Sequence, residues 1–249
     1  MISKDQLLQL EPAALQMLQP SVIDGRELDY EELEAIFKAC GAFWFHSGDP
    51  QDPHAELTSG KCSNGFVSCP EVLSLCNLSQ IMAEQLVLRL RHRYSGPVDW
   101  VVGSDSAALG LAKDVANVLS HEPGSLVRNY PMQKGPDKTQ IWEKQIILPD
   151  QKVLHVEELM TTAGTAEAVR AGIKAGNPHP VEFVPFLPVL VHRPDKGEGL
   201  EVDGSKVIWA MHYDIWAVEP DLCELCRQGS KPLRPRAGNN WVLLTNSPR

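Results

Sequence analysis

Long apolar runs are missing from this sequence, and so is any surplus of positive charge. No run approaches the roughly 18 apolar residues needed to cross a bilayer, and residues 1–20 lack the basic start and apolar core of a signal peptide. The net charge of −9 argues against a general nucleic-acid binder, because affinity for a phosphate backbone needs a basic surface. We therefore expect a cytoplasmic protein that binds neither membranes nor nucleic acids.

Internal repeats and low-complexity segments are also absent, and the six cysteines are scattered along the chain. Without an export signal, these cysteines are expected to be reduced thiols. Cys223 and Cys226 form a Cys-x-x-Cys pair, which alone is half a zinc site. Three interpretations stay open for the pair: unliganded thiols, a metal held together with distant ligands, or redox chemistry.

A chain of 249 residues, of which 43% are apolar, can bury a substantial hydrophobic core. Short apolar runs and helical patterns predict an α/β fold, with a central parallel sheet flanked by helices. The expected strands are 98–102, 125–128, 153–156, 181–191 and 207–211. The expected helices are 79–93, capped by Ser79, 109–119 and 166–175.

The first 41 residues predict helices rather than strands. A helix over residues 5–19 is interrupted by Pro12, and a second runs over Tyr30–Ala39, from the N-cap Asp29 to Gly41. Packing alone is enough to explain this helical cap. Residues 42–70 mix short strand-like runs with turn formers, and Leu57–Lys61 followed by Phe66 indicates a hairpin.

The segment from Lys152 to Ala166 has the clearest chemical pattern. Two acids, Glu157 and Glu158, come where a buried strand is expected to leave the sheet. A turn then leads into a helix, and it contains Thr161, Thr162, Ala163, Gly164 and Thr165. Free backbone N–H groups, hydroxyls and the helix dipole at such a turn predict a phosphate cradle. The neighbouring carboxylates suit sugar hydroxyls or a hydrated Mg²⁺.

Three other segments are candidates for the same sheet edge. The small-residue loop after strand 98–102, with Ser104, Asp105 and Ser106, either presents backbone amides or lets helix and strand pack closely. The polar stretch 129–144 is either a mobile lid with lysines or a solvated loop. Arg193 lies just past the end of an expected strand, where ligands meet open α/β sheets.

On these motifs, the sequence resembles the type I phosphoribosyltransferases and, within them, the orotate phosphoribosyltransferases. The most specific match is Val153–Thr165, which is similar to the family signature for 5-phosphoribosyl-1-diphosphate (PRPP). Three weaker matches lie elsewhere in the chain. Leu57–Phe66 is similar to the family's hood segment, and Val101–Ala108 is similar to its pyrophosphate loop. The third match is Leu190–Gly197. The family's catalytic loop usually contains a histidine, which Arg128–Lys138 lacks.

Together with the residue patterns, the resemblance divides the chain into a helical N-terminal extension (1–41), a hood segment (42–78), a phosphoribosyltransferase core (79–211) and a tail with the Cys-x-x-Cys pair (212–249). It implies transfer of ribose 5-phosphate from PRPP to a base, orotate in the first instance, with Mg²⁺ and a homodimer. The alternatives are another base, or a non-catalytic regulator that binds nucleotide or PRPP.

The resemblance also implies a role for each candidate residue. Glu157 and Glu158 face the ribose hydroxyls, with Glu158 among the catalytic residues, and Thr161–Thr165 hold the 5-phosphate. Ser104, Asp105 and Ser106 form the loop that contacts the diphosphate. The catalytic lid residues are Arg128, Lys134 and Lys138, and the base-binding residues are Lys61, Phe66 and Arg193.

Overall fold

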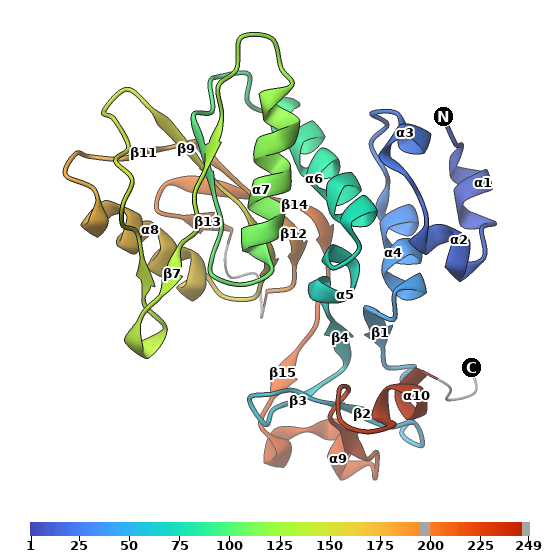
Figure 1. Cartoon of the computed structure of the whole chain (residues 1–249). Coiled ribbons are helices and arrows are strands. Elements are labelled where there is room, and N and C mark those ends of the chain that lie inside the picture. Colours follow the sequence, from blue (N-terminus) through green and yellow to red (C-terminus); the bar gives the residue numbers. More distant parts are fainter. Residues whose placement is uncertain (195–199, 246–249) are drawn as a thin grey trace.

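The computed structural model describes residues 1–194 and 200–245, except for the side chain of Lys138. Two four-stranded sheets form its centre (Figure 1). The first has the order β11-β9-β5-β6 and is parallel throughout: β11 (Glu182–Phe183), β9 (Lys152–His155), β5 (Trp100–Val102) and β6 (Arg128–Asn129). The second has the order β10-β12-β14-β13: β10 (Glu157–Met160), β12 (Phe186–His192), β14 (Ser205–His212) and β13 (Glu201–Val202), of which only β13 is antiparallel.

The two sheets are continuous, because the chain passes directly from β9 into β10 and from β11 into β12. Backbone hydrogen bonds from Val156 N to Val102 O and from Val184 N to Val153 O lie at the two breaks. The predicted α/β class with a central parallel sheet is therefore confirmed. The acids were expected beyond the strand end, and this was wrong: Glu157 and Glu158 are the first two residues of β10.

Three long helices flank the sheet: α6 (Cys76–Arg91), α7 (Ala108–Ser120) and α8 (Gly164–Gly176). Alternate residues of β5 point to opposite faces of the sheet and belong to two different apolar clusters. Val101 packs with residues of α6 and α7, whereas Trp100 and Val102 pack with residues of α8. The helices therefore cover opposite faces of the sheet. The expected start of α6 was wrong: Leu75 is its N-cap, and Ser79 is buried and donates to Asp114 at 2.5 Å.

The N-terminal region is helical, as expected: α1 (Lys4–Leu8), α2 (Pro12–Gln16), α3 (Pro20–Ile23) and α4 (Tyr30–Ala39). Pro12 begins α2 because its missing N–H costs nothing at a helix start. Asp29 caps α4 as predicted and forms a capping box with Glu32.

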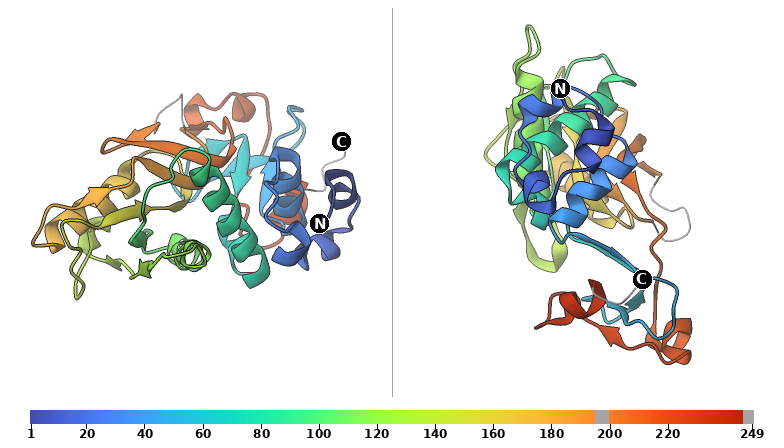
Figure 2. Two further views of the ribbon diagram at one scale, coloured as in Figure 1. Left: turned by 90° about the horizontal axis from the view of Figure 1, so that it is seen from above. Right: turned by 90° about the vertical axis from the view of Figure 1, so that its right-hand side faces the viewer.

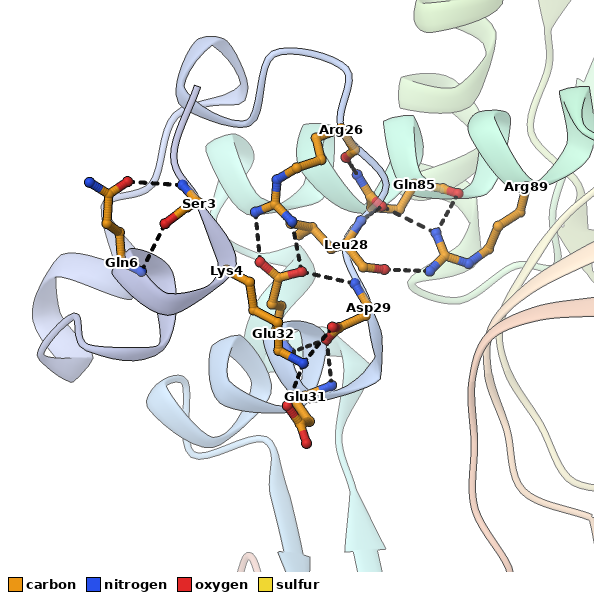
Figure 3. Close-up of polar contacts among 10 residues, drawn as sticks. All are labelled: Ser3, Lys4, Gln6, Arg26, Leu28, Asp29, Glu31, Glu32, Gln85 and Arg89. Atoms are coloured by element: carbon orange, nitrogen blue, oxygen red, sulfur yellow. Dashed lines mark hydrogen bonds and ion pairs between the residues drawn. The ribbon is translucent and has the colours of Figure 1, made fainter.

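A polar network joins these helices to α6 (Figure 3). Arg26 forms a two-fold ion pair with Glu32, which is 1% exposed, at 2.8 and 2.6 Å. From α6, Gln85 accepts from Leu28 N at 2.6 Å, and Arg89 donates to Leu28 O at 2.6 Å. The N-terminal helices are thus anchored to the core by buried hydrogen bonds as well as by apolar packing.

Residues far apart in the sequence form a smaller body beside the core. Its sheet has the order β15-β3-β2-β16: β15 (Ala217–Val218), β3 (Cys62–Ser63), β2 (His54–Glu56) and β16 (Pro232–Leu233). We call residues 54–63 and 217–233 the hood–tail unit. It includes the 3-10 turn η2 (Pro220–Leu222) and α9 (Glu224–Arg227), and Figure 2 shows it below the core in the right-hand view.

Three short elements lead from the hood–tail unit towards the core: β1 (Phe43–Phe45), β4 (Gly65–Val67) and α5 (Cys69–Leu73). Strands β1 and β4 pair antiparallel. The last described helix, α10 (Asn240–Thr245), packs against the hood–tail unit through Leu244, which shares an apolar cluster with Ala55 and Leu233. The boundaries 1–41, 42–78, 79–211 and 212–249 stay a prediction.

The polar stretch expected as a mobile lid forms a hairpin of β7 (Gln133–Lys134) and β8 (Gln140–Ile141), joined through the 3-10 turn η1 (Pro136–Lys138). Its stem packs on α8. A Cβ atom at Gly172 or Gly176 would collide with the carbonyl oxygen of Gln140 or Trp142, so the two glycines permit this close approach. Across residues 1–194 and 200–245, no helix has the length and apolar character to cross a membrane.

Candidate active site at the edge of the parallel sheet

The carboxylate of Glu157 is 3% exposed, and each of its oxygens has a partner. Ser104 donates to Oε2 at 2.7 Å, and the ring Nε2 of His155 lies 2.8 Å from Oε1. Burying a carboxylate is costly unless it is paired and hydrogen-bonded, and these contacts meet that need. His155 was missed by the sequence interpretation, although it stands two residues before Glu157 and therefore on the same face of an extended chain.

Glu158 is less enclosed and has a different environment. Ser106 Oγ lies 3.1 Å from both carboxylate oxygens, and Ser104 Oγ lies 2.9 Å from Ser106 Oγ. Burial, followed by the charge of Glu157, raises the pKa of Glu158 to about 7. Glu158 therefore changes charge near neutrality.

The loop from Gly103 to Ser106 connects β5 to α7 and lies against the acids. Gly103 has a packing role, because a Cβ there would meet the carbonyl oxygen of Ala108 at 2.5 Å. The loop also has the polar role expected from the sequence, since Ser104 and Ser106 bind the two acids. Asp105 is exposed, and its backbone N–H donates to Gln140 of β8 at 3.1 Å.

The expected phosphate cradle lies at the start of α8. The helix begins at Gly164, its N-cap is Ala163, and no side chain caps it. Thr162, Gly164 and Thr165 are exposed and Thr161 is half-buried. An uncapped helix start offers backbone N–H groups and the positive end of the dipole, which together favour a phosphate.

Arg193 follows β12 beside this cradle. Its backbone N–H donates to Met160 O at 2.9 Å, one residue before Thr161. Burial lowers the pKa of the Arg193 guanidinium, and among the described residues its buried Nε has no hydrogen-bond partner. Cys69, whose thiol donates to Glu158 O at 3.2 Å, raises the pKa of Arg193 slightly. Arg193 therefore lies near Glu158 with an unsatisfied N–H group.

The other predicted base-binding residues have partners in the hood–tail unit or tail. Lys61 is 3.5 Å from Glu219. The ring of Phe66 packs edge-on against Trp241, with centroids 5.8 Å apart, and Arg236 lies 5.4 Å from the Phe66 centroid. The contacts of Lys61 and Phe66 thus do not join them to Glu158, and their base-binding roles stay a prediction.

The predicted lid cations are dispersed. Arg128 lies over the ring of Trp100, 5.6 Å from its centroid, and Lys134 is exposed on β7. The side chain of Lys138 lies outside the described residues. Their catalytic roles stay a prediction.

A separate polar cluster gathers Cys223 and Cys226 with His54 and Cys62. The last two residues were missed as partners of the Cys-x-x-Cys pair. Their distance of more than 160 positions from it leaves no local spacing signal, and only the pairing of β3 with β15 and of β2 with β16 brings them together.

A hollow of about 850 Å³ is lined mainly by residues of α4, β1 and α10. Its aromatic lining includes Phe43, Trp44, Tyr213 and Trp241, and none of the site residues predicted from the sequence lines it. We place the candidate active site at Glu158 and the α8 start, because the converging polar groups lie there.

Comparisons with known proteins agree with the resemblance read from the sequence. No family model matches the chain. The chain is 27% identical to the orotate phosphoribosyltransferase of Desulforamulus reducens over 208 residues, 84% of this chain and 97% of that protein. It is also 27% identical to the orotate phosphoribosyltransferase of Pelotomaculum thermopropionicum over 207 residues, 82% and 96% of the two chains.

Among solved structures, the UMP synthase of Leishmania donovani has a TM-score of 0.53 and 18% identity, covering 73% of this chain and 36% of that one. This is a likeness of fold alone. The sequence comparisons confirm the predicted resemblance to orotate phosphoribosyltransferases.

Proposed function

We propose that this protein transfers the ribose 5-phosphate group of PRPP to orotate, giving orotidine 5-phosphate and diphosphate. The observation that carries the proposal is the junction of Glu157 and Glu158 with the uncapped start of α8 at Gly164, six to seven residues further on. Similarity to curated orotate phosphoribosyltransferases over most of both sequences supports the choice of reaction.

The donor sugar fits this junction at both ends. Backbone N–H groups of Thr161–Thr165 and the α8 dipole would hold the 5-phosphate. Glu158, whose carboxylate is held by one serine hydroxyl, would accept from a ribose hydroxyl. Glu157 would fix the loop through Ser104, since both of its oxygens are already engaged.

In the reaction, the bond from C1 of the ribose to the diphosphate oxygen breaks, a bond from C1 to the base nitrogen forms, and the base loses the proton of that nitrogen. Positive charge gathers on the ring and negative charge on the diphosphate, so catalysis rests on placement and electrostatics. Ser104, Asp105 and Ser106 would orient the diphosphate. Arg128, Lys134 and Lys138 would approach it from the hairpin and its base, and exclude water.

The donor set also suits Mg²⁺, which prefers carboxylate and phosphate oxygens. Glu158 and the exposed Asp105 are the residues that would hold the hydrated ion with PRPP. When bound, Mg²⁺ supplies charge neutralisation for the leaving diphosphate. We further propose that the protein acts in the cytoplasm as a homodimer.

Arg193 favours orotate over an uncharged base. Its buried guanidinium has an Nε–H without a partner among the described residues, and a ligand carboxylate would satisfy it. A charge-assisted pair of this kind contributes about 1.5 to 3 kcal/mol, so an Arg193→Gln variant should raise the KM for orotate by about 10- to 100-fold. The KM for PRPP should change little, and the exposed Arg93→Gln serves as the matched control.

The test follows loss of orotate absorbance with PRPP and Mg²⁺. Heat stabilisation by PRPP without orotate consumption would contradict the proposed reaction and indicate a non-catalytic regulator. Diphosphate release with adenine, guanine or uracil in place of orotate would indicate another base. A Glu158→Gln variant that binds PRPP as the wild type does would contradict the assignment of the sugar site.

A further inference from the structure

Four potential metal-ligand atoms from both ends of the chain converge in the hood–tail unit. His54 comes from β2, Cys62 from β3, and Cys223 and Cys226 from the start of α9. One ligand atom from each lies within 4.8 Å of all the others. His54 and Cys223 are 0% exposed and Cys62 is 1% exposed, so three of the four groups are enclosed.

The separations match the edges of a tetrahedron around a zinc ion. Zn–S bonds of about 2.3 Å and Zn–N bonds of about 2.0 to 2.1 Å place sulfurs roughly 3.8 Å apart and nitrogen roughly 3.5 Å from sulfur. Here Cys62 Sγ lies 3.6 Å from Cys226 Sγ, and His54 Nε2 lies 3.6 Å from Cys223 Sγ and 3.4 Å from Cys226 Sγ. A disulfide would need sulfurs about 2.05 Å apart, and the cysteines are free.

The histidine is oriented as a metal ligand. Ser230 Oγ donates to Asp52 O at 2.6 Å, so it accepts from the Nδ1–H of His54 at 2.8 Å. That hydrogen bond leaves the lone pair of Nε2 directed at the three sulfurs. A second partner that fixes the histidine tautomer is a regular feature of zinc sites.

The Cys-x-x-Cys turn is also arranged for a thiolate. The backbone N–H of Cys226 points at Cys223 Sγ, 3.5 Å away, which would stabilise negative charge on that sulfur. The second cysteine thus supplies both a ligand and, through its backbone, a hydrogen bond to the first.

The hood–tail unit has little else to hold it together. Its strands are two or three residues long, and among its described residues only Ala55 and Leu233 join a buried apolar cluster, which Trp44 and Leu244 complete from outside the unit. Bodies with so small a core usually need a disulfide or a metal for stability.

We propose that His54, Cys62, Cys223 and Cys226 bind one structural zinc ion. Three thiolates and one imidazole in a tetrahedral arrangement suit zinc, and four protein ligands leave no open position for catalysis. His54 and Cys62 lie on either side of the turn Leu57–Lys61, so the ion would fix both ends of that turn and tie it to the tail. The proposal does not depend on the proposed reaction.

The first test is the metal content of the full-length protein purified without added metal or chelator, measured by elemental analysis. We expect about one zinc per chain. After removal of the metal, addition of Co²⁺ should give the intense visible absorption of tetrahedral thiolate-bound cobalt, which Zn²⁺ then abolishes. Protein with neither bound zinc nor the cobalt spectrum would overturn the proposal.

Variants then assign the ligands. Cys226→Ser, the least enclosed ligand, should lose zinc and the cobalt spectrum, and Ser230→Ala should weaken zinc binding by about 10- to 100-fold through the histidine. Cys76→Ser, an exposed cysteine of α6, is the matched control and should keep one zinc. If Cys226→Ser does not fold, the wild-type metal content and cobalt spectrum still decide the proposal. A Cys226–Cys62 or Cys226–Cys223 disulfide in metal-free protein, with no zinc uptake after reduction, would indicate redox chemistry and contradict it.

Discussion

The parallel-sheet core and the hood–tail unit bury polar side chains by opposite means. In the core, Glu157 is surrounded by a large apolar structure, and neighbouring side chains neutralise the cost of burying it. In the hood–tail unit, the polar cluster of His54 and three cysteines lies at the centre of a body with few apolar contacts. A large core can accommodate costly polar groups for function, whereas a small body uses its polar groups for stability.

The largest effect is expected when the proposed zinc is removed, because this should destabilise the hood–tail unit and leave the core unchanged. Chelation should raise the hydrogen-exchange rates of amides in residues 54–63 and 217–233 by about two orders of magnitude or more, because structural zinc contributes folding free energy directly. Amides of β12 and β14 should keep their protection. Equal loss of protection in both bodies would mean that the hood–tail unit is not stabilised separately.

In the N-terminal helical region, the next effect is expected at Arg26. An Arg26→Met variant leaves the buried carboxylate of Glu32 without its ion-pair partner and should lower the free energy of unfolding by about 3 kcal/mol. The double variant Arg26→Met with Glu32→Gln should recover most of this loss, since glutamine retains the capping box with Asp29. Chemical denaturation measures both, and a double variant as unstable as the single one would contradict the ion-pair explanation.

Glu158 should make the stability of the core depend on pH. Its pKa is raised from 4.5 to about 7, so its contribution is complete below about pH 4.5 and is lost as the pH rises through 7. At 1.36 kcal/mol per pKa unit, the loss is about 3 kcal/mol. Glu158→Gln should flatten this part of the profile of unfolding free energy between pH 5 and 8. A variant with the wild-type slope would place the titration elsewhere.

The smallest effect is expected where the hairpin meets α8. Gly172→Ala would bring a Cβ into the carbonyl oxygen of Gln140, and overpacking of this kind costs about 1 to 3 kcal/mol. The matched control Gly110→Ala in α7 has open space and should stabilise the protein by up to about 1 kcal/mol, as helix propensity predicts. Thermal unfolding should therefore move in opposite directions, and a stabilising Gly172→Ala would show that the hairpin is not held against α8.

The candidate site was predictable in part. Glu157, Glu158 and the turn before α8 are adjacent in sequence, so their spacing alone indicated a sugar-phosphate site. The hydrogen-bond partners of Glu157 were harder to predict from the sequence. Ser104 was a candidate because it follows a strand, but its hydrogen bond to Glu157 depends on the parallel pairing of β5 with β9.

The stretch expected as a mobile lid shows what a local pattern leaves out. Its proline, glycine and lysines indicated a solvated excursion, but Met132 and Trp142 are buried against α8, where Gly172 and Gly176 make room for the hairpin. Met132 and Trp142 lie in one segment of the chain, and Gly172 and Gly176 lie in another. A local pattern describes each segment, and close packing between them depends on the assembled fold.

The sequence by itself determined the α/β class, the capped helix Tyr30–Ala39 and the carboxylate pair before the predicted phosphate cradle, because these depend on neighbouring residues and on periodicity. Only the tertiary structure decided that both oxygens of Glu157 are engaged, that Arg193 lies beside the cradle, and that His54 and Cys62 complete the Cys-x-x-Cys pair. Those contacts join residues from 2 to more than 160 positions apart, and for the distant ones no local pattern encodes the pairing that brings them together.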